Sequence, residues 1–152
     1  MPALQTTYTT TIRPGIPGMP ATTHGYNADT RVVETAAGIG FGLAVSQGTA
    51  DKGVVLGGAA AVGVSMRDIT LVHSAAADLD KYVDNENMSV MVQGDIWVLT
   101  DSAVTKGGVC TYDNVTGVLG STAVGGSKVA FPGRWQTSTS GAGLAKLRVN
   151  LP

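Results

Sequence analysis

The stretch GIGFGLAVSQ, residues 38–47, decides the fold class. Its larger apolar residues, Ile39, Phe41, Leu43 and Val45, alternate with glycine, alanine and serine. A period of two is typical of a half-buried β-strand, because successive side chains of a strand point to opposite faces. We therefore expect one strand over residues 39–47, with its glycines on the face where another segment packs too closely for side chains.

The same glycines do not fit a nucleotide-binding loop. A dinucleotide fingerprint needs G-x-G-x-x-G in front of a helix, but Leu43 stands where the third glycine should be. No lysine of the chain completes the Gly-Lys-Ser/Thr ending of a Walker loop. No nucleotide cofactor is expected, and the glycines serve the fold.

The composition also favours strands. Gly, Val, Ala and Thr make up half of the 152 residues, and Val and Thr branch at Cβ, which suits a pleated surface. Charged residues make up 14% of the chain, against roughly 25% in an ordinary soluble domain. Such a chain is either an Ala/Gly-rich β domain or a protein whose surface is largely covered by other subunits. Because the basic residues are scattered and the net charge is -1, neither nucleic acid nor a membrane is an expected partner.

Further segments along the chain show strand patterns. Short strands are predicted at residues 31–36, 59–72, 128–138 and 143–151, together with a bent strand or strand pair at 88–100, a hairpin at 106–121, and one short helix candidate at 74–83. Strands at intervals of about ten residues are typical of barrels and sandwiches. The prediction is an all-β fold: a compact small barrel or sandwich of short antiparallel strands, with an extended Pro- and Gly-containing N-terminal arm and at most one short helix.

The first 30 residues differ from the rest. Prolines at every third position from 14 to 20 fix φ and remove backbone donors, which excludes a helix or a central strand. The segment is expected to run extended over a surface, either as a loose tail or as an arm that contacts a neighbouring subunit. We favour an arm (residues 1–30) attached to a single β domain (residues 31–152). The candidate contact residues are Ile12, Arg13, Pro14, Ile16, Pro17 and Met19.

A search for catalytic or metal-binding residues finds little. Cys110 is alone, which excludes an internal disulfide, and His24 lies far from His73 in the sequence. The best metal candidate is the acidic group Asp78, Asp80, Asp84 and Glu86, but its spacing fails the EF-hand loop and favours a solvated loop. No nucleophile signature is present. No catalytic, cofactor-binding or metal-binding residue is assigned, and no enzyme activity is expected.

The amino terminus lacks the basic start and apolar run of a signal peptide, and no stretch reaches the roughly 18 apolar residues of a membrane span. We expect a soluble product made in a cytoplasm.

The order of segments along the chain carries a family resemblance. An opening MPALQTTY…PG is followed by TRVVETAAGIGFGLAVSQGTADKG (30–53), VGVSMRDITL (62–71), MSVMVQGDIWV (88–98) and GRWQTSTSGAGLAKLRVNL (133–151). Together they resemble the structural cement, or capsid decoration, proteins of tailed bacteriophages over nearly the whole chain. The resemblance implies a trimer that binds the major capsid protein on the outer surface of the icosahedral head, at junctions between capsid subunits. It implies no cofactor, synthesis in the bacterial host cytoplasm, and stabilisation of the expanded head.

Two other classes of function stay open from the sequence. One is a β module of a virion that binds carbohydrate or a host surface, with Trp97 or Trp135 as an exposed platform for a sugar. The other is a small hydrolase whose site has no recognisable signature.

Overall fold

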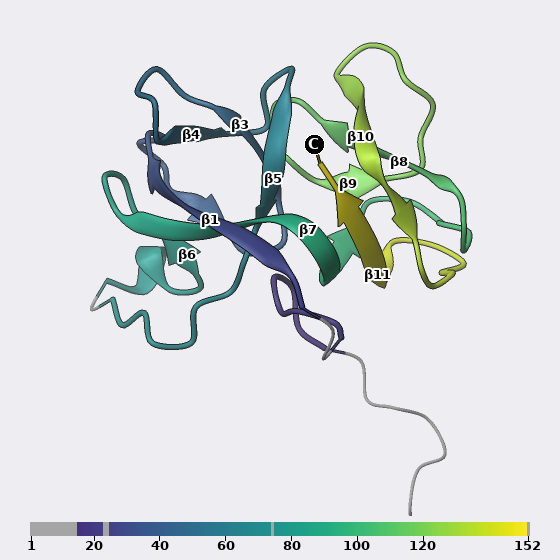
Figure 1. Cartoon of the computed structure of the whole chain (residues 1–152), viewed down its shortest axis with the longest axis horizontal. Coiled ribbons are helices and arrows are strands. Elements are labelled where there is room, and N and C mark those ends of the chain that lie inside the picture. The colour runs from purple at the N-terminus through teal and green to yellow at the C-terminus, as the bar shows by residue number, and fades with distance from the viewer. Residues whose placement is uncertain (1–14, 23–24, 74, 152) are drawn as a thin grey trace, which may run out of the picture.

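The computed structural model describes residues 15–22, 25–73 and 75–151, and strands dominate it (Figure 1). Its only helical element in these ranges is one 3-10 turn, η1 (Ala76–Asp78), in place of the helix candidate at 74–83. The strands are β1 (Asn27–Val33), β2 (Ile39–Gly40), β3 (Ala44–Gln47), β4 (Gly53–Leu56), β5 (Ala61–Ser65), β6 (Lys81–Tyr82), β7 (Asn87–Thr100), β8 (Val109–Asp113), β9 (Leu119–Gly120), β10 (Lys128–Trp135) and β11 (Gly143–Asn150). The all-β prediction is confirmed.

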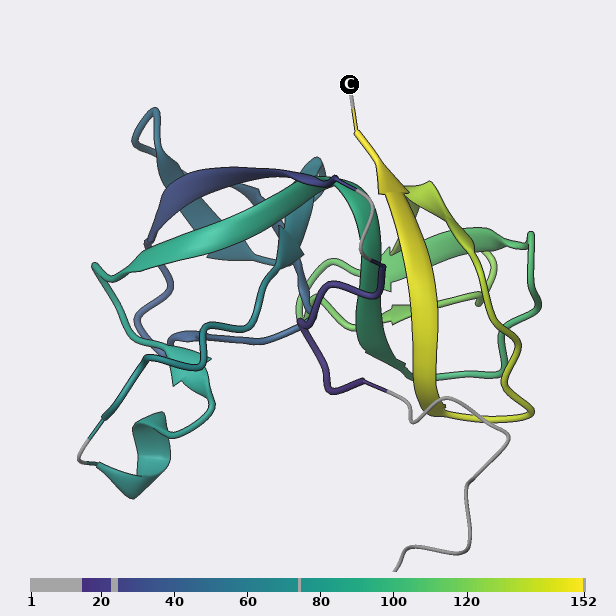
Figure 2. The same cartoon turned by 60° about the horizontal axis from the view of Figure 1, so that its bottom comes forward.

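Nine of the described strands form two closed rings that share β7. In barrel 1, β1, β4, β3 and β5 lead to the first half of β7, which pairs back with β1. In barrel 2, β11, β10, β8 and β9 follow the second half of β7, and β9 pairs back with β7. The two rings lie side by side along the long axis (Figures 1 and 2). Barrel, rather than sandwich, is therefore the correct alternative, although the β1–β4 and β7–β9 pairs are parallel where antiparallel strands were predicted.

The shared strand β7 bends where the sequence predicts. Its first half pairs with β1 through Gln93, and its second half pairs with β11 over residues 93–100. Gly94 lies at the junction with φ of 134°, a backbone conformation that glycine adopts without steric cost. One continuous strand can therefore serve two barrels because it changes direction at this glycine.

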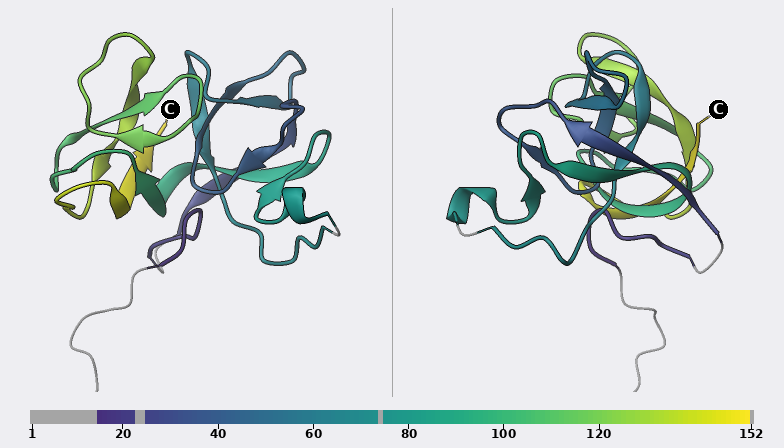
Figure 3. Two further views of the ribbon diagram at one scale, coloured as in Figure 1. Left: turned by 180° about the vertical axis from the view of Figure 1, so that it is seen from behind. Right: turned by 60° about the vertical axis from the view of Figure 1, so that its left-hand side comes forward.

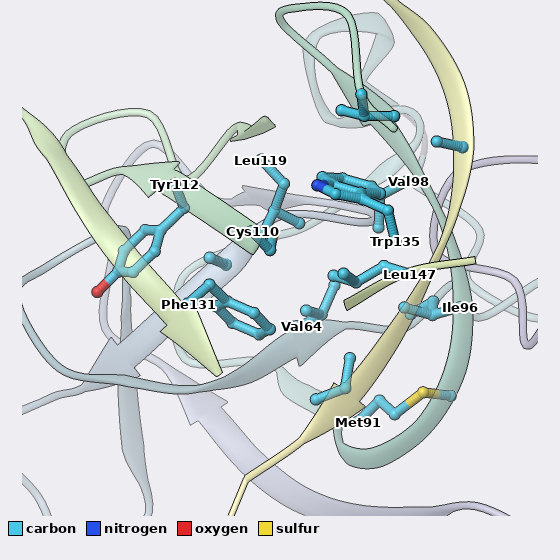
Figure 4. Close-up of a cluster of buried hydrophobic side chains, with 14 of the residues drawn as sticks. Val64, Met91, Ile96, Val98, Cys110, Tyr112, Leu119, Phe131, Trp135 and Leu147 are labelled. Carbon is cyan, nitrogen blue, oxygen red and sulfur yellow. The ribbon is translucent and has the colours of Figure 1, made fainter. Parts of the chain in front are cut away.

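Two clusters of buried apolar side chains fill the structure. The core of barrel 1 is made of Val33, Ile39, Phe41, Val45, Val54, Tyr82, Met88 and Val90. The other cluster fills barrel 2 around the fully buried Trp135 and extends to Ala44, Val64 and Met91 on strands of barrel 1 (Figure 4). The Nε1–H of Trp135 donates to the carbonyl oxygen of Val109 at 3.1 Å. Ala44 and Val45 are adjacent on β3 but belong to different clusters, so β3 lies between the two cores.

Residues 38–47, with which the prediction of the fold class began, do not form one strand. They form β2 and β3, with a turn between them at Phe41 and Gly42, and β2 pairs with β6 outside the nine-stranded sheet. Gly42 has φ of 74°, which turns the chain out of the extended conformation. The prediction of one strand over residues 39–47 was therefore wrong, because the alternating pattern continues across a turn.

The C-terminal half follows the predictions more closely. β8 and β9 pair as a hairpin, and the Asp113 carboxylate accepts hydrogen bonds from the N–H groups of Val115 and Thr116 in its turn. The predicted strands at 128–138 and 143–151 are β10 and β11, which pair antiparallel. No helix in the described ranges is long and apolar enough to cross a membrane.

Candidate interaction surface

Residues 15–22 lie along the bend of β7, but they are not extended throughout as the prolines predict. The N–H of Met19 donates to the carbonyl oxygen of Ile16 at 3.1 Å, which closes a turn at Pro17 and Gly18. Pro20 forms an antiparallel bridge with Ile96, and the N–H of Ala21 donates to the carbonyl oxygen of Asp95 at 2.7 Å. The N–H of Trp97 donates to the carbonyl oxygen of Met19 at 2.9 Å. The segment thus pairs with β7 at Asp95–Trp97, in the gap between the residues of β7 that pair with β1 and the one that pairs with β9.

Gly18 packs closely against residues of barrel 1 and its flanking segments. Its φ is 82°, its carbonyl oxygen accepts from the N–H of Arg67 at 2.8 Å, and a Cβ here would lie 2.8 Å from the Cβ of Phe41. A Cβ on Gly42 would likewise lie 3.0 Å from the nitrogen of Gly18. The close approach expected at the glycines of residues 38–42 is therefore present at Gly42, and the segment that packs there is the Pro-containing one.

The predicted contact residues divide into two groups. Ile12, Arg13 and Pro14 lie outside the described residues. Ile16 and Met19 expose 46% and 45% of their surface, although the backbone around them is bound to the chain's own body. Pro17 is half-buried, and its carbonyl oxygen accepts from Nε of Arg67 at 3.2 Å. The role of these residues in contacts with another subunit stays a prediction, as does the boundary at residue 30, which falls inside β1.

Sequence reasoning missed a second apolar surface, here called the apolar knob, made of Ile69, Val72 and Leu79. Their exposed fractions are 85%, 90% and 59%. Residues 59–72 were expected to be one strand, but β5 ends at Ser65. The reason is Asp68, whose carboxylate accepts from both the N–H and the hydroxyl of Thr70, which stabilises a turn. An Asp two residues before a Thr was the signal in the sequence that could have marked this turn.

The acidic residues around the apolar knob are separated from one another by partners of their own. Asp80 pairs with Arg67 at 2.8 Å, and Asp78 pairs with Lys81 at 3.1 Å. Glu86 lies 3.3 Å from His73 and accepts from the N–H of Val83. In the described ranges, no three His, Cys, Asp or Glu side chains are grouped as a metal site would need. The acidic candidate at residues 78–86 therefore separates into individual contacts: Asp78 and Asp80 form ion pairs, Glu86 lies beside His73, and Asp84 accepts from the side chain of Asn85.

A groove on the outside of barrel 2 forms a third feature, here called the barrel-2 groove, with a volume of about 580 Å3. It lies where the register of β10 against β8 shifts between Phe131 and Arg134. The lining includes the exposed residues Val109, Ala130 and Pro132, with Arg134 and Arg148 beside them. Arg148 makes a two-pronged contact with the buried Asp95 carboxylate at 2.8 and 3.0 Å, and this pairing raises the pKa of Arg148.

The groups that could carry chemistry are placed unfavourably for it. Cys110 is buried in barrel 2, and this burial raises the pKa of its thiol, which keeps it protonated and unreactive. Trp135 is fully buried, so it cannot be the sugar platform considered above. Trp97 is half-buried, with Nζ of Lys146 5.6 Å from its ring centre. His24 lies outside the described residues.

The chain is thus an all-β protein of two small closed barrels joined by one strand, with apolar side chains exposed on an outer loop. The family model of the structural cement protein (E217 gp24/Pam3 gp6) matches residues 4–150. The chain belongs to this family of phage cement proteins, which gives it a structural role in association with a phage capsid.

Comparison with solved structures concerns the fold. A chain from a structure described as "The capsid of Myoviridae Phage XM1" has a TM-score of 0.69 with this protein and is 15% identical to it; the match covers 97% of this chain and 98% of that chain. At this identity the likeness shows the shared fold and nothing more. Among curated proteins, none matches the chain.

Proposed function

We propose that this protein is a cement protein that binds the outer surface of the icosahedral head, at junctions between major capsid subunits, and acts there as a trimer made in the host cytoplasm. The observation that carries the proposal is the family match over residues 4–150. It is supported by exposed apolar side chains in residues 15–22 and in the connection between β5 and β6. Both segments project from the same side of the ribbon (Figures 1 and 3). Large exposed apolar side chains gathered together are typical of contact surfaces.

The proposed mechanism is thermodynamic. A protein that binds the expanded shell but not its unexpanded precursor stabilises the expanded state by mass action. Many copies on one shell add their effects, because each bound copy spans subunits that would otherwise separate. No reacting group is needed for this, since the contact itself supplies the free energy.

The exposed side chains of Ile16 and Met19, with the residues before them, are proposed to touch the capsid. Their backbone is already bound to β7, so docking would order only the side chains and would cost little conformational entropy.

Co-sedimentation with empty capsids of the protein's own phage, before and after expansion, tests the proposal. We expect the chain to sediment with expanded shells and to stay in solution with unexpanded ones. Ile16→Asp and Met19→Asp should weaken shell binding, whereas Val124→Asp, on an exposed loop of barrel 2, serves as the matched control. A chain that sediments with neither form of the shell would refute the proposal.

A further inference from the structure

The apolar knob gathers three strongly exposed apolar side chains in one place. Ile69, Val72 and Leu79 all line one hollow of about 290 Å3, so their side chains surround a common space. Asp68 lines the same hollow, and within the described part of the chain its carboxylate is bound only by Thr70. Because Asp78 and Asp80 each have a cation beside them, Asp68 is the acid of the knob without a cationic partner among the described residues.

The barrel-2 groove has complementary properties. Val109 exposes 59% of its surface there, next to Ala130 and Pro132, so the groove offers apolar contact area. Pro132 lacks an N–H, and β8 and β10 lose their regular register beside it. Arg148 is paired with Asp95, whereas Arg134 has no carboxylate partner in the described ranges. The groove is therefore apolar, with one unpaired cation at its edge.

The apolar knob and the barrel-2 groove of one chain cannot contact each other. The apolar knob belongs to the connection between β5 and β6 beside barrel 1, and the groove lies between β8 and β10 of barrel 2, toward the other end of the long axis (Figure 1). Contact between two different patches is heterologous, and it produces a closed ring or an open chain of subunits. A trimer about a three-fold axis is a ring of this kind.

We propose that the apolar knob of one copy docks in the barrel-2 groove of a second copy, with Asp68 brought near Arg134. The inference rests on the proposed function for ring closure at three copies, and it adds the two faces that meet. Apolar area supplies the affinity, and the single pair of opposite charges selects the register, since a charge buried without its partner is costly.

Light scattering during size exclusion of the full chain tests the contact directly. We expect a mass of three times 15.4 kDa that falls toward the monomer on dilution. Val72→Asp and Ile69→Asp should raise the dissociation constant by at least a hundredfold, because each places a charge in an apolar contact. Val124→Asp, with a valine 64% exposed outside both faces, should leave the mass unchanged.

Charge exchange identifies the partner residues. Asp68→Lys and Arg134→Glu should each weaken association about tenfold, and the double variant should return to within about threefold of the wild type. Asp68→Asn removes the charge but keeps an oxygen acceptor for Thr70. Weaker association of this variant therefore cannot be due to loss of the turn. Circular dichroism melts check that every variant is folded.

The outcomes separate this inference from the proposed function. A wild-type chain that stays monomeric, or a Val72→Asp variant that associates normally, overturns the inference, even where the chain still sediments with expanded capsids. Single charge variants that weaken association with no recovery in the double variant overturn the Asp68–Arg134 register. If the wild-type chain is a trimer that the knob variants disrupt, but the wild-type trimer does not bind capsids, the inference is upheld and the proposed function is refuted.

Discussion

The backbone N–H of Gly18 donates to the carbonyl oxygen of Trp97 at 2.8 Å, which attaches the Pro-containing segment to the one strand that both barrels share. Gly18 also accepts from Arg67, which follows β5 of barrel 1. Residues 15–22 therefore stabilise the junction between the barrels, and only what precedes them can be removed without breaking described contacts.

Truncation should show where the integral part of the N-terminal segment begins. Deleting residues 2–14 should leave the free energy of unfolding nearly unchanged, because all the described contacts of residues 15–22 remain. Extending the deletion through residue 20 removes the partners of Trp97 N–H and Arg67 N–H, and we expect a loss of at least about 2 kcal/mol. Urea unfolding monitored by tryptophan fluorescence measures both. Equal stabilities for the two truncations would show that residues 15–20 do not stabilise the junction between the barrels.

Gly18→Ala should destabilise the protein by about 2–4 kcal/mol, because positive φ strain adds to steric conflict with Arg67 and Phe41. Gly107→Ala is the matched control: Gly107 has φ of 79° but nothing within 4 Å of its Cβ position. It should therefore cost only the backbone strain, about 1–2 kcal/mol. Chemical denaturation of both variants gives the difference, and a Gly18→Ala cost no larger than that of Gly107→Ala would rule out the close packing.

Tyr82 should make the protein sensitive to alkali. Its hydroxyl donates to the carbonyl oxygen of Met66 at 2.8 Å, and burial raises the pKa of Tyr82 to about 12. The unfolded state ionises near pH 10, so the stability due to this residue is complete below pH 10 and is lost as the pH rises toward 12. Tyr82→Phe should unfold more easily at pH 7 but should show a flatter decline above pH 10. An identical alkaline slope for both chains would argue against this role.

Asp113 should contribute to stability in the opposite range of pH. Hydrogen bonds from Ser127, Thr116 and Val115 hold the pKa of Asp113 well below its ordinary value. A depressed pKa in the folded state means that the stability is present above the unfolded value near 3.9 and is lost as the pH falls below it. We expect Ser127→Ala, which removes the largest of these contributions, to make the acid decline shallower. Denaturation midpoints between pH 7 and pH 2 measure the slope, and an unchanged slope would count against the assignment.

The predictable parts of the fold were those decided locally. The bend of β7 follows from a glycine beside Asp95, and the β8–β9 hairpin follows from Asp113, whose carboxylate binds the next turn. Residues 15–22 form no helix, because proline fixes φ and lacks a backbone N–H. Each of these features needs only a few neighbouring residues, so a single sequence contains the information.

The parts of the fold that were predicted wrongly or missed depend on residues far apart in the sequence. Residues 39–47 alternate in the sequence, yet Gly42 turns the chain there because Pro17 and Gly18 pack against it. The apolar run Ile69–Leu71–Val72 looked like the end of a strand, and only the structure leaves Ile69 and Val72 in solvent. A period of two cannot distinguish a strand from two strands flanking a turn when the turn is stabilised from elsewhere.

By itself, the sequence determined the β class, the glycine and proline positions where the chain must turn or extend, and the resemblance to cement proteins. Only the tertiary structure decided that the strands close into two barrels around a shared β7, and that residues 15–22 bind at the junction between them. It also decided which apolar residues remain outside, because closure of a barrel buries whichever face its register selects. Pairing between strands far apart in the chain sets that register, and no local pattern contains it.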